Sequence, residues 1–176
     1  MSSSMHIVAF SGCLREQSYN TAALRALQSL LPQDVELEIL SLEDLPVFSA
    51  SAIETEAVRN FQQKVAQADA VLIATPEYHG LLPHALRNAL AWTVRSGETS
   101  VLAGKPTAMM GVGRQDSAEE QLTQLRVLLS QSRAAIVEAP EVYLNSGRAQ
   151  FDARAEQQLR TLLDALVEQV RSALVY

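Results

Sequence analysis

The chain has 176 residues, of which 48% are hydrophobic and 19% charged, and this suits one soluble domain that buries roughly 70% of its unfolded surface. A net charge of -6 and only two lysines, Lys64 and Lys105, argue against a nucleic-acid binder, because phosphate backbones need clustered Lys and Arg. The single cysteine, Cys13, excludes an internal disulfide and a Cys/His zinc cluster. No apolar run approaches the ~20 residues of a membrane span, so a cytoplasmic protein is expected.

Residues 1–5 are expected to form a short disordered lead to a single domain over residues 6–176. Five apolar or alternating segments predict strands, which cover residues 7–10, 35–40, 70–74, 107–111 and 134–137. Five amphipathic periods predict helices, which include residues 24–31, 58–65, 86–93, 122–129 and 159–174. The third helix is expected to open at Pro83, and the fourth to be capped by Ser117 with Glu120.

Alternating strands and helices over this length predict a three-layer α/β sandwich, because right-handed crossovers must cover both faces of a parallel sheet. We expect a five-stranded parallel sheet in the flavodoxin-like order 2-1-3-4-5. Ligands of such sheets bind beyond the carboxyl ends of the strands, near the point where the strand order reverses. The loops after the first, third and fourth strands therefore form the candidate site.

The first of these loops, residues 11–20, has the composition of a phosphate cradle. Arg15 offers a charge-assisted fork, Ser18 a hydroxyl and Asn20 an amide, beside a helix start that favours an anion. Gly12 lets the backbone approach a ligand closely. The alternative is structural: Ser18 or Asn20 caps the helix, and Arg15 is a solvated surface residue.

The first loop lacks the glycine-rich motifs that bind dinucleotides and nucleoside triphosphates. Gly12 is the only glycine in the first 79 residues, so neither a G-x-G-x-x-G dinucleotide turn nor a P-loop is present there. A site for a mononucleotide remains as the expectation.

The second loop, residues 75–80, lies where the other end of that ligand is expected. Pro76 stiffens this loop, and Tyr78 either packs on an aromatic ring of the ligand or caps the core. Glu77 and His79 are expected to be solvated or hydrogen-bonded rather than catalytic, and no metal is expected.

The third loop, residues 111–116, follows the fourth strand. Gly113 would let its backbone approach the edge of a bound ring, and Arg114 would face that ring or an incoming anion. The alternative is an ordinary turn with an exposed arginine.

Together the loops resemble those of the NAD(P)H-dependent FMN reductase family, a flavodoxin-like group that includes chromate, quinone and azo-dye reductases. Nearly the whole chain aligns in outline. The first family motif, G-S-x-R-x-x-S-x-N, is matched by Gly12, Cys13, Leu14, Arg15, Ser18, Tyr19 and Asn20. The second, P-E-Y-[NH]-x-x-x-P-x-x-L-[KR]-N-A, is matched by Pro76, Glu77, Tyr78, His79, Pro83, Leu86, Arg87, Asn88 and Ala89. Cys13 replaces the usual serine, and His84 stands where glycine is common.

This resemblance implies bound FMN and a hydride donor, NADPH or NADH. It implies that the FMN phosphate is bound by Arg15, Ser18 and Asn20, and Ser11, Cys13 and Tyr19 complete the phosphate side of the expected set. It implies flavin-ring contacts from Pro76, Glu77, Tyr78 and His79, with Gly113 and Arg114 near the ring. The acceptor would be a quinone, azo compound, metal oxyanion or free flavin, and the assembly a homodimer or homotetramer. No catalytic side chain is expected, because the cofactor carries the electrons.

Two other functions are compatible with this topology. A non-enzymatic flavodoxin-like electron carrier is one, although such carriers usually have a threonine- and glycine-rich phosphate loop without arginine. A phosphoacceptor signalling domain is the other, but it needs an Asp at the end of the third strand, where this chain has Pro76-Glu77.

Overall fold

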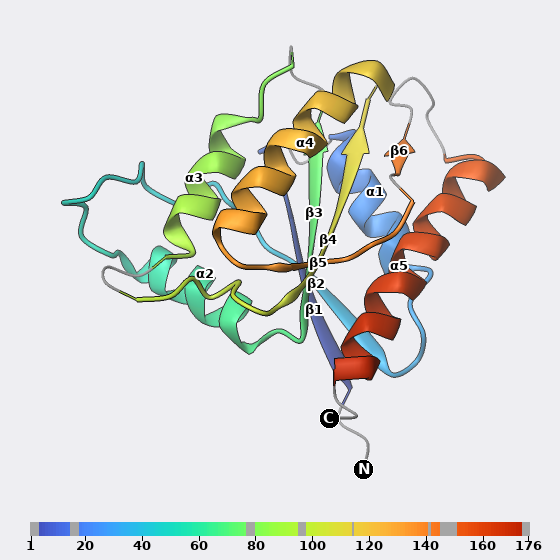
Figure 1. Cartoon of the computed structure of the whole chain (residues 1–176), viewed down its shortest axis with the longest axis horizontal. Helices are drawn as coiled ribbons and strands as arrows, with labels where there is room; N and C mark the ends of the chain where they lie inside the picture. The colour runs from blue at the N-terminus through green and yellow to red at the C-terminus, as the bar shows by residue number, and fades with distance from the viewer. Residues whose placement is uncertain are drawn as a thin grey trace.

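A parallel β-sheet forms the centre of the molecule in the computed structural model, which describes residues 4–14, 18–76, 80–94, 98–113, 115–140, 142–144 and 151–173. The strands run in the order β2-β1-β3-β4-β5, which confirms the order predicted from the sequence (Figure 1). A sixth strand also pairs with β4. The strands are β1 (Met5–Ser11), β2 (Val35–Ile39), β3 (Ala70–Pro76), β4 (Pro106–Val112), β5 (Ala135–Ile136) and β6 (Tyr143–Leu144).

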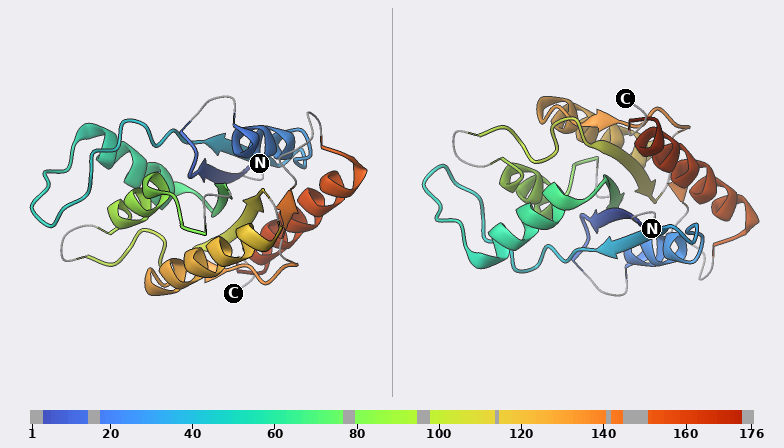
Figure 2. Two further views of the ribbon diagram at one scale, coloured as in Figure 1. Left: turned by 90° about the horizontal axis from the view of Figure 1, so that it is seen from above. Right: turned by 90° about the horizontal axis from the view of Figure 1, so that it is seen from below.

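Helices cover both faces of this sheet and make the three expected layers. They are α1 (Tyr19–Gln28), α2 (Glu56–Gln67), α3 (His84–Trp92), α4 (Gln115–Gln131) and α5 (Ala153–Ala173). Helices α1 and α5 pack on one face, and α2, α3 and α4 on the other (Figure 2).

The alternation of side chains along β1 shows how the two cores form. Ile7 and Ala9 point into the core under α1 and α5, whereas Val8 and Phe10 point into the core under α2, α3 and α4. All four side chains are fully buried. A strand covered on both faces must be apolar throughout, and this is why its sequence lacks the alternation of a half-exposed strand.

Two short strands, rather than one, pair with the outer edge of β4. β5 pairs with Pro106 and Thr107, and β6 pairs with Gly111 and Val112 at the carboxyl end. Pro140 lies in the segment between them and has no N–H for a ladder hydrogen bond. The edge strand is therefore split, and the sequence predicted only its first half.

Several helix and strand boundaries differ from the expectations. α1 ends before Leu31, which the expected first helix included. β1 begins at Met5, which is buried, so Met5 belongs to the sheet and not to the expected disordered lead. Pro83 is the N-cap of α3 rather than its first residue. α4 begins at Gln115, so Ser117 lies inside the helix, and the predicted cap at Ser117 is wrong.

Lys105, just before β4, connects the amino-terminal edge of the sheet to the end of α2. Its ammonium group donates to the carbonyl oxygens of Ala66, at 3.2 Å, and Ala68. Burial lowers the pKa of Lys105, and the nearby carboxylate of Asp69 opposes that shift. This group thus stabilises the end of α2 and lies at the amino-terminal edge of the sheet. In the described part of the chain, no helix is long and apolar enough to span a bilayer.

Candidate functional site

The carboxyl ends of β1, β3 and β4 lie side by side and bring the candidate loops together. Ser11 at the end of β1 is in register with Ala74, and Pro76 at the end of β3 is in register with Val112. Gly113 directly follows Val112. The structure thus places the start of the first loop, Pro76 and Gly113 on one edge of the sheet, as the sequence predicted.

Gly12 joins the first loop to the second. Its N–H donates to the carbonyl oxygen of Ala74 at 3.1 Å. A Cβ atom placed on Gly12 would lie 3.0 Å from Pro83 Cγ and 3.2 Å from Pro76 Cδ. The absence of a side chain therefore lets the loop after β1 pack directly against two rigid proline rings.

This contact predicts the effect of a single methyl group. We expect Gly12→Ala to lower the free energy of unfolding by about 1 kcal/mol and to weaken FMN binding, because the proline rings must shift and cannot rotate away. Thermal unfolding and FMN titration measure the two effects. Gly104→Ala is a control for steric contact, since nothing lies within 4 Å of a Cβ there. Its φ of 71° makes alanine unfavourable through backbone strain alone. A Gly12→Ala protein with wild-type stability and FMN affinity would contradict this packing argument.

The start of α1 presents polar groups to the same edge. Ser18 is the N-cap, and its Oγ accepts from the Thr21 N–H at 3.1 Å, so the structural alternative for Ser18 is confirmed. Its hydroxyl also lies 3.0 Å from the Thr21 hydroxyl. If Thr21 donates in that pair, the Ser18 hydrogen stays free for a phosphate, so capping and phosphate binding are compatible.

Asn20 has a buried polar atom that lacks a hydrogen-bond partner among the described residues. This atom is the side-chain Oδ1. A buried polar atom without a partner costs about 1–3 kcal/mol, so it marks a place where a ligand group can compensate. The amide can offer its oxygen to a ligand hydroxyl or, when rotated, its NH₂ group to a phosphate.

Helix α4 holds the part of the second loop that follows residue 79. Gln124 Nε2 donates to the carbonyl oxygen of Gly80 at 2.7 Å, and Gln124 Oε1 accepts from the Leu82 N–H at 3.2 Å. Gly80 has a φ of 72°, and a Cβ there would lie 2.6 Å from the Glu120 carboxylate. A glycine is thus required where the loop turns back toward α3.

A buried polar pair lies below this loop. Thr75 Oγ1 donates to Gln121 Oε1 at 3.4 Å, and both side chains are fully buried. Gln121 Nε2 has no partner among the described residues. The pair connects the end of β3 to α4, close to the expected ring-binding residues.

Strand β6 fixes the backbone of the third loop. The Gly113 N–H donates to the carbonyl oxygen of Leu144 at 2.7 Å, and the φ of Gly113 is 153°. This angle favours glycine. Close approach of this backbone to a bound ring stays a prediction.

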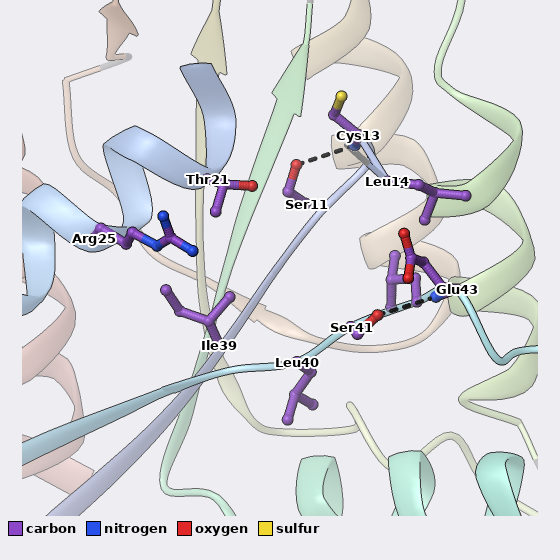
Figure 3. A pocket seen from close by; sticks show the side chains of 10 residues that line it. Ser11, Cys13, Leu14, Thr21, Arg25, Ile39, Leu40, Ser41 and Glu43 are labelled. Atoms are coloured by element: carbon purple, nitrogen blue, oxygen red, sulfur yellow. Dashed lines mark hydrogen bonds between the residues drawn. The ribbon is translucent and has the colours of Figure 1, made fainter. Parts of the chain in front are cut away.

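A pocket of about 330 Å³ lies beside the first loop, on the side away from β3, between the ends of β1 and β2 (Figure 3). We call it the β1–β2 pocket. It is lined by Ser11, Cys13, Leu14, Thr21, Arg25, Ile39, Leu40, Ser41, Leu42 and Glu43. Sequence reasoning missed its polar residues Thr21, Arg25, Ser41 and Glu43. The spacing of Thr21 and Arg25, four residues apart on one helix, was the available signal.

Several expected site residues lie outside the described residues, namely Arg15, Glu77, Tyr78, His79 and Arg114. Of the described ones, Ser11 is buried, Cys13 is half-buried, and Tyr19 is 46% exposed. The roles of all twelve expected cofactor-binding residues remain predictions.

A parallel sheet in this order, with helices on both faces and polar loops gathered at its switch point, defines a flavodoxin-like α/β protein. The sequence matches the model of the NADPH-dependent FMN reductase family over residues 5–149, and the chain belongs to that family.

Individual relatives agree with this assignment. The chain is 33% identical to a 2-hydroxy-1,4-benzoquinone reductase of a Burkholderia species, covering 95% of this chain and 97% of the relative. It is also 33% identical to an NAD(P)H-dependent FMN reductase of Pseudomonas aeruginosa, covering 88% and 85%. Among solved structures, FerB, a flavoenzyme NAD(P)H:(acceptor) oxidoreductase from Paracoccus denitrificans, superposes with a TM-score of 0.85 at 26% identity, covering 96% and 98%. The chain is therefore an oxidoreductase, and its family uses FMN and NADPH.

The described residues fit FMN. The unpartnered amide of Asn20 lies in the second residue of α1, where the N-terminus of the helix favours a phosphate. Gly12, Pro76 and Gly113 continue the same edge of the sheet toward β4, where the ring of the cofactor is expected.

Proposed function

We propose that this protein is an NAD(P)H-dependent FMN reductase that passes electrons from the nicotinamide nucleotide to a quinone. The observation that carries the proposal is the direct contact of the loops after β1 and β3 at Gly12, beside the buried, unpartnered amide of Asn20. The name of the benzoquinone reductase, at 33% identity over most of the chain, supports a quinone as the acceptor. Azo compounds, metal oxyanions and free flavin remain the other acceptor classes to be compared.

The residues of the chain contribute by binding the cofactor and orienting its ring toward the hydride donor. FMN bound at this edge would supply the redox chemistry: it would take a hydride, with its two electrons, from the nicotinamide nucleotide and pass two electrons on to the quinone. Ser18, Asn20 and Arg15 are proposed to hold its phosphate, and the backbone near Pro76 and Gly113 to place the ring edge. Holding donor and ring in a fixed stack lowers the barrier by positioning, and the cofactor carries the electrons, so no side chain need act as acid, base or nucleophile.

The segment that follows residue 79 of the second loop is anchored to α4. Gln124 fixes both Gly80 and Leu82 through hydrogen bonds of 2.7 and 3.2 Å. Pro83 then caps the N-terminus of α3, with its φ fixed by the proline ring. We infer that this loop positions the ring-binding residues Pro76 to His79.

Exposed apolar side chains support the expected homodimer or homotetramer. Val47 is 70% exposed, Ile53 is 86% exposed and Leu81 is 60% exposed. Asn88 holds the segment of Val47 against α3, because it accepts from the Phe48 N–H and donates to the Pro46 carbonyl oxygen. Exposed apolar side chains of this size suit contact with a second copy.

An anaerobic absorbance titration tests the proposed function. Purified protein is saturated with FMN, freed of excess and titrated with NADPH and, separately, NADH. Prompt bleaching of the bound flavin, followed by reoxidation with a benzoquinone, is the expected result. Bound flavin that stays oxidised would instead support the flavodoxin-like electron carrier. Failure to retain flavin would overturn the cofactor assignment.

A further inference from the structure

The β1–β2 pocket contains a cation that the structure leaves unpaired. Arg25 lines the pocket and has neither an ion pair nor a hydrogen bond within the part of the chain that the structure describes. By contrast, Arg160 and Arg171 on α5 each pair with a carboxylate, at 2.9 and 2.7 Å. An unpaired arginine beside a pocket is available to an anionic ligand.

Helix geometry explains why Arg25 reaches the pocket. Side chains of a helix lean toward its N-terminus, so Arg25 extends over Thr21, one turn earlier (Figure 3). Thr21 is bonded to the N-cap Ser18, which belongs to the expected phosphate cradle. Ser11 and Cys13 also line both the pocket and the first loop. The pocket is therefore continuous with the cradle.

The opposite wall of the pocket adds a carboxylate and hydroxyl groups. Glu43 and Ser41 belong to the segment that follows β2, and the Ser41 Oγ accepts from the Glu43 N–H at 3.3 Å. The Ser41 hydroxyl hydrogen is thus directed elsewhere. Farther along this segment, Asn88 and Trp92 of α3 donate to the Pro46 carbonyl oxygen at 2.9 and 2.7 Å. These hydrogen bonds anchor the segment that follows β2 to α3.

The two walls together select a ligand class. Arg25, with the hydroxyl of Thr21, suits a phosphate group, whereas Glu43 repels a free phosphate and suits the hydroxyl groups of a sugar. We propose that the β1–β2 pocket binds a phosphorylated sugar, with the phosphate on Arg25 and the sugar hydroxyls on Glu43.

This inference rests on the proposed function, which supplies two molecules with such a group. FMN carries a ribityl phosphate, which the proposed function places on Ser18, Asn20 and Arg15, so for FMN Arg25 would be a further cation of the same cradle. NADPH carries a 2′-phosphorylated ribose, which would occupy the pocket separately from FMN. A purely structural role for Arg25 is the competing explanation, because it lies in the last turn of α1, where a cation stabilises the helix. That role affects stability but not ligand affinity.

Binding measurements on matched ligands test the pocket. FMN and riboflavin are titrated onto apoprotein by flavin fluorescence, and 2′,5′-ADP and adenosine onto apoprotein and FMN-loaded protein by calorimetry. The proteins are wild type, Arg25→Met, Glu43→Gln and the control Arg171→Met. Arg171 lies at the opposite end of the sheet, paired with Asp34 just before β2. The control removes the same charge far from the pocket.

Arg25→Met is expected to raise the dissociation constant of FMN or of 2′,5′-ADP about tenfold or more, without changing that of riboflavin or adenosine. Glu43→Gln is expected to lower the same constant about two- to fivefold, because it removes repulsion and keeps a hydrogen-bonding oxygen. The phosphorylated ligand that responds identifies which of the two molecules occupies the pocket. Arg171→Met should match wild type.

Unchanged dissociation constants of both phosphorylated ligands in Arg25→Met would overturn the proposal. So would a lower melting temperature with equal losses for riboflavin and FMN, because that pattern belongs to a structural arginine. If wild-type protein binds no FMN, the proposed function fails, and the 2′,5′-ADP titration of apoprotein still decides the role of Arg25.

Discussion

Arg15→Ala is expected to raise the dissociation constant for FMN about ten- to more than hundredfold. A charge-assisted hydrogen bond to a phosphate contributes roughly 1.5 to 3 kcal/mol, and each 1.36 kcal/mol corresponds to about tenfold. Arg15 lies outside the described residues, and the expectation comes from its place in the loop between β1 and α1. Fluorescence titration of apoprotein with FMN measures the effect.

Riboflavin is the matched ligand for this experiment, because it lacks only the phosphate. Its affinity should be the same in wild type and Arg15→Ala. Arg15→Lys should fall between the two proteins for FMN, since lysine keeps the charge but loses the bidentate geometry. Equal FMN affinity in folded Arg15→Ala and wild type would remove Arg15 from the site.

Phe10→Ala is expected to lower the free energy of unfolding by about 3–5 kcal/mol. Phe10 is fully buried in β1, and its ring packs edge-on against Phe61 of α2, with centroids 5.6 Å apart and planes at 67°. Removing the ring leaves a cavity between the sheet and α2. Because a domain of this kind is stable by only about 5–15 kcal/mol, much of its stability would be lost.

Urea unfolding followed by circular dichroism measures this loss. Ile53→Ala is the matched control, since the Ile53 side chain is 86% exposed and its truncation should change stability by less than about 0.5 kcal/mol. Phe10→Leu should lie between the control and Phe10→Ala. A Phe10→Ala midpoint equal to that of Ile53→Ala would show that the Phe10–Phe61 contact contributes little.

The arrangement of the sheet could be predicted because the burial of each strand determines its pattern of apolar and polar residues. β3 is covered on both faces and reads as a continuous apolar run, whereas β2 alternates because it lies at an edge. β6 could not be found in this way. It has two residues, follows Pro140 and depends on the edge of β4 for its pairing.

Candidate site residues could be predicted only where they belong to a motif within one loop. The cradle sequence located Ser18 and Asn20, but the pairing of Ser18 with Thr21 depends on the geometry of the helix start. Arg25 and Glu43 face one pocket from segments that are distant in sequence. Local periodicity contains no information on such a pair, because strand order and crossover direction create it.

The packing of Gly12 against Pro76 and Pro83 has a consequence for protein engineering. These residues come from two segments of the chain that are more than sixty positions apart, yet each constrains the shape of the other. Grafting either loop alone from a relative would pair it with a surface shaped for a different partner. Exchange of cofactor preference between members of the family should therefore succeed when both loops are transferred together, with this glycine and these prolines kept as one unit.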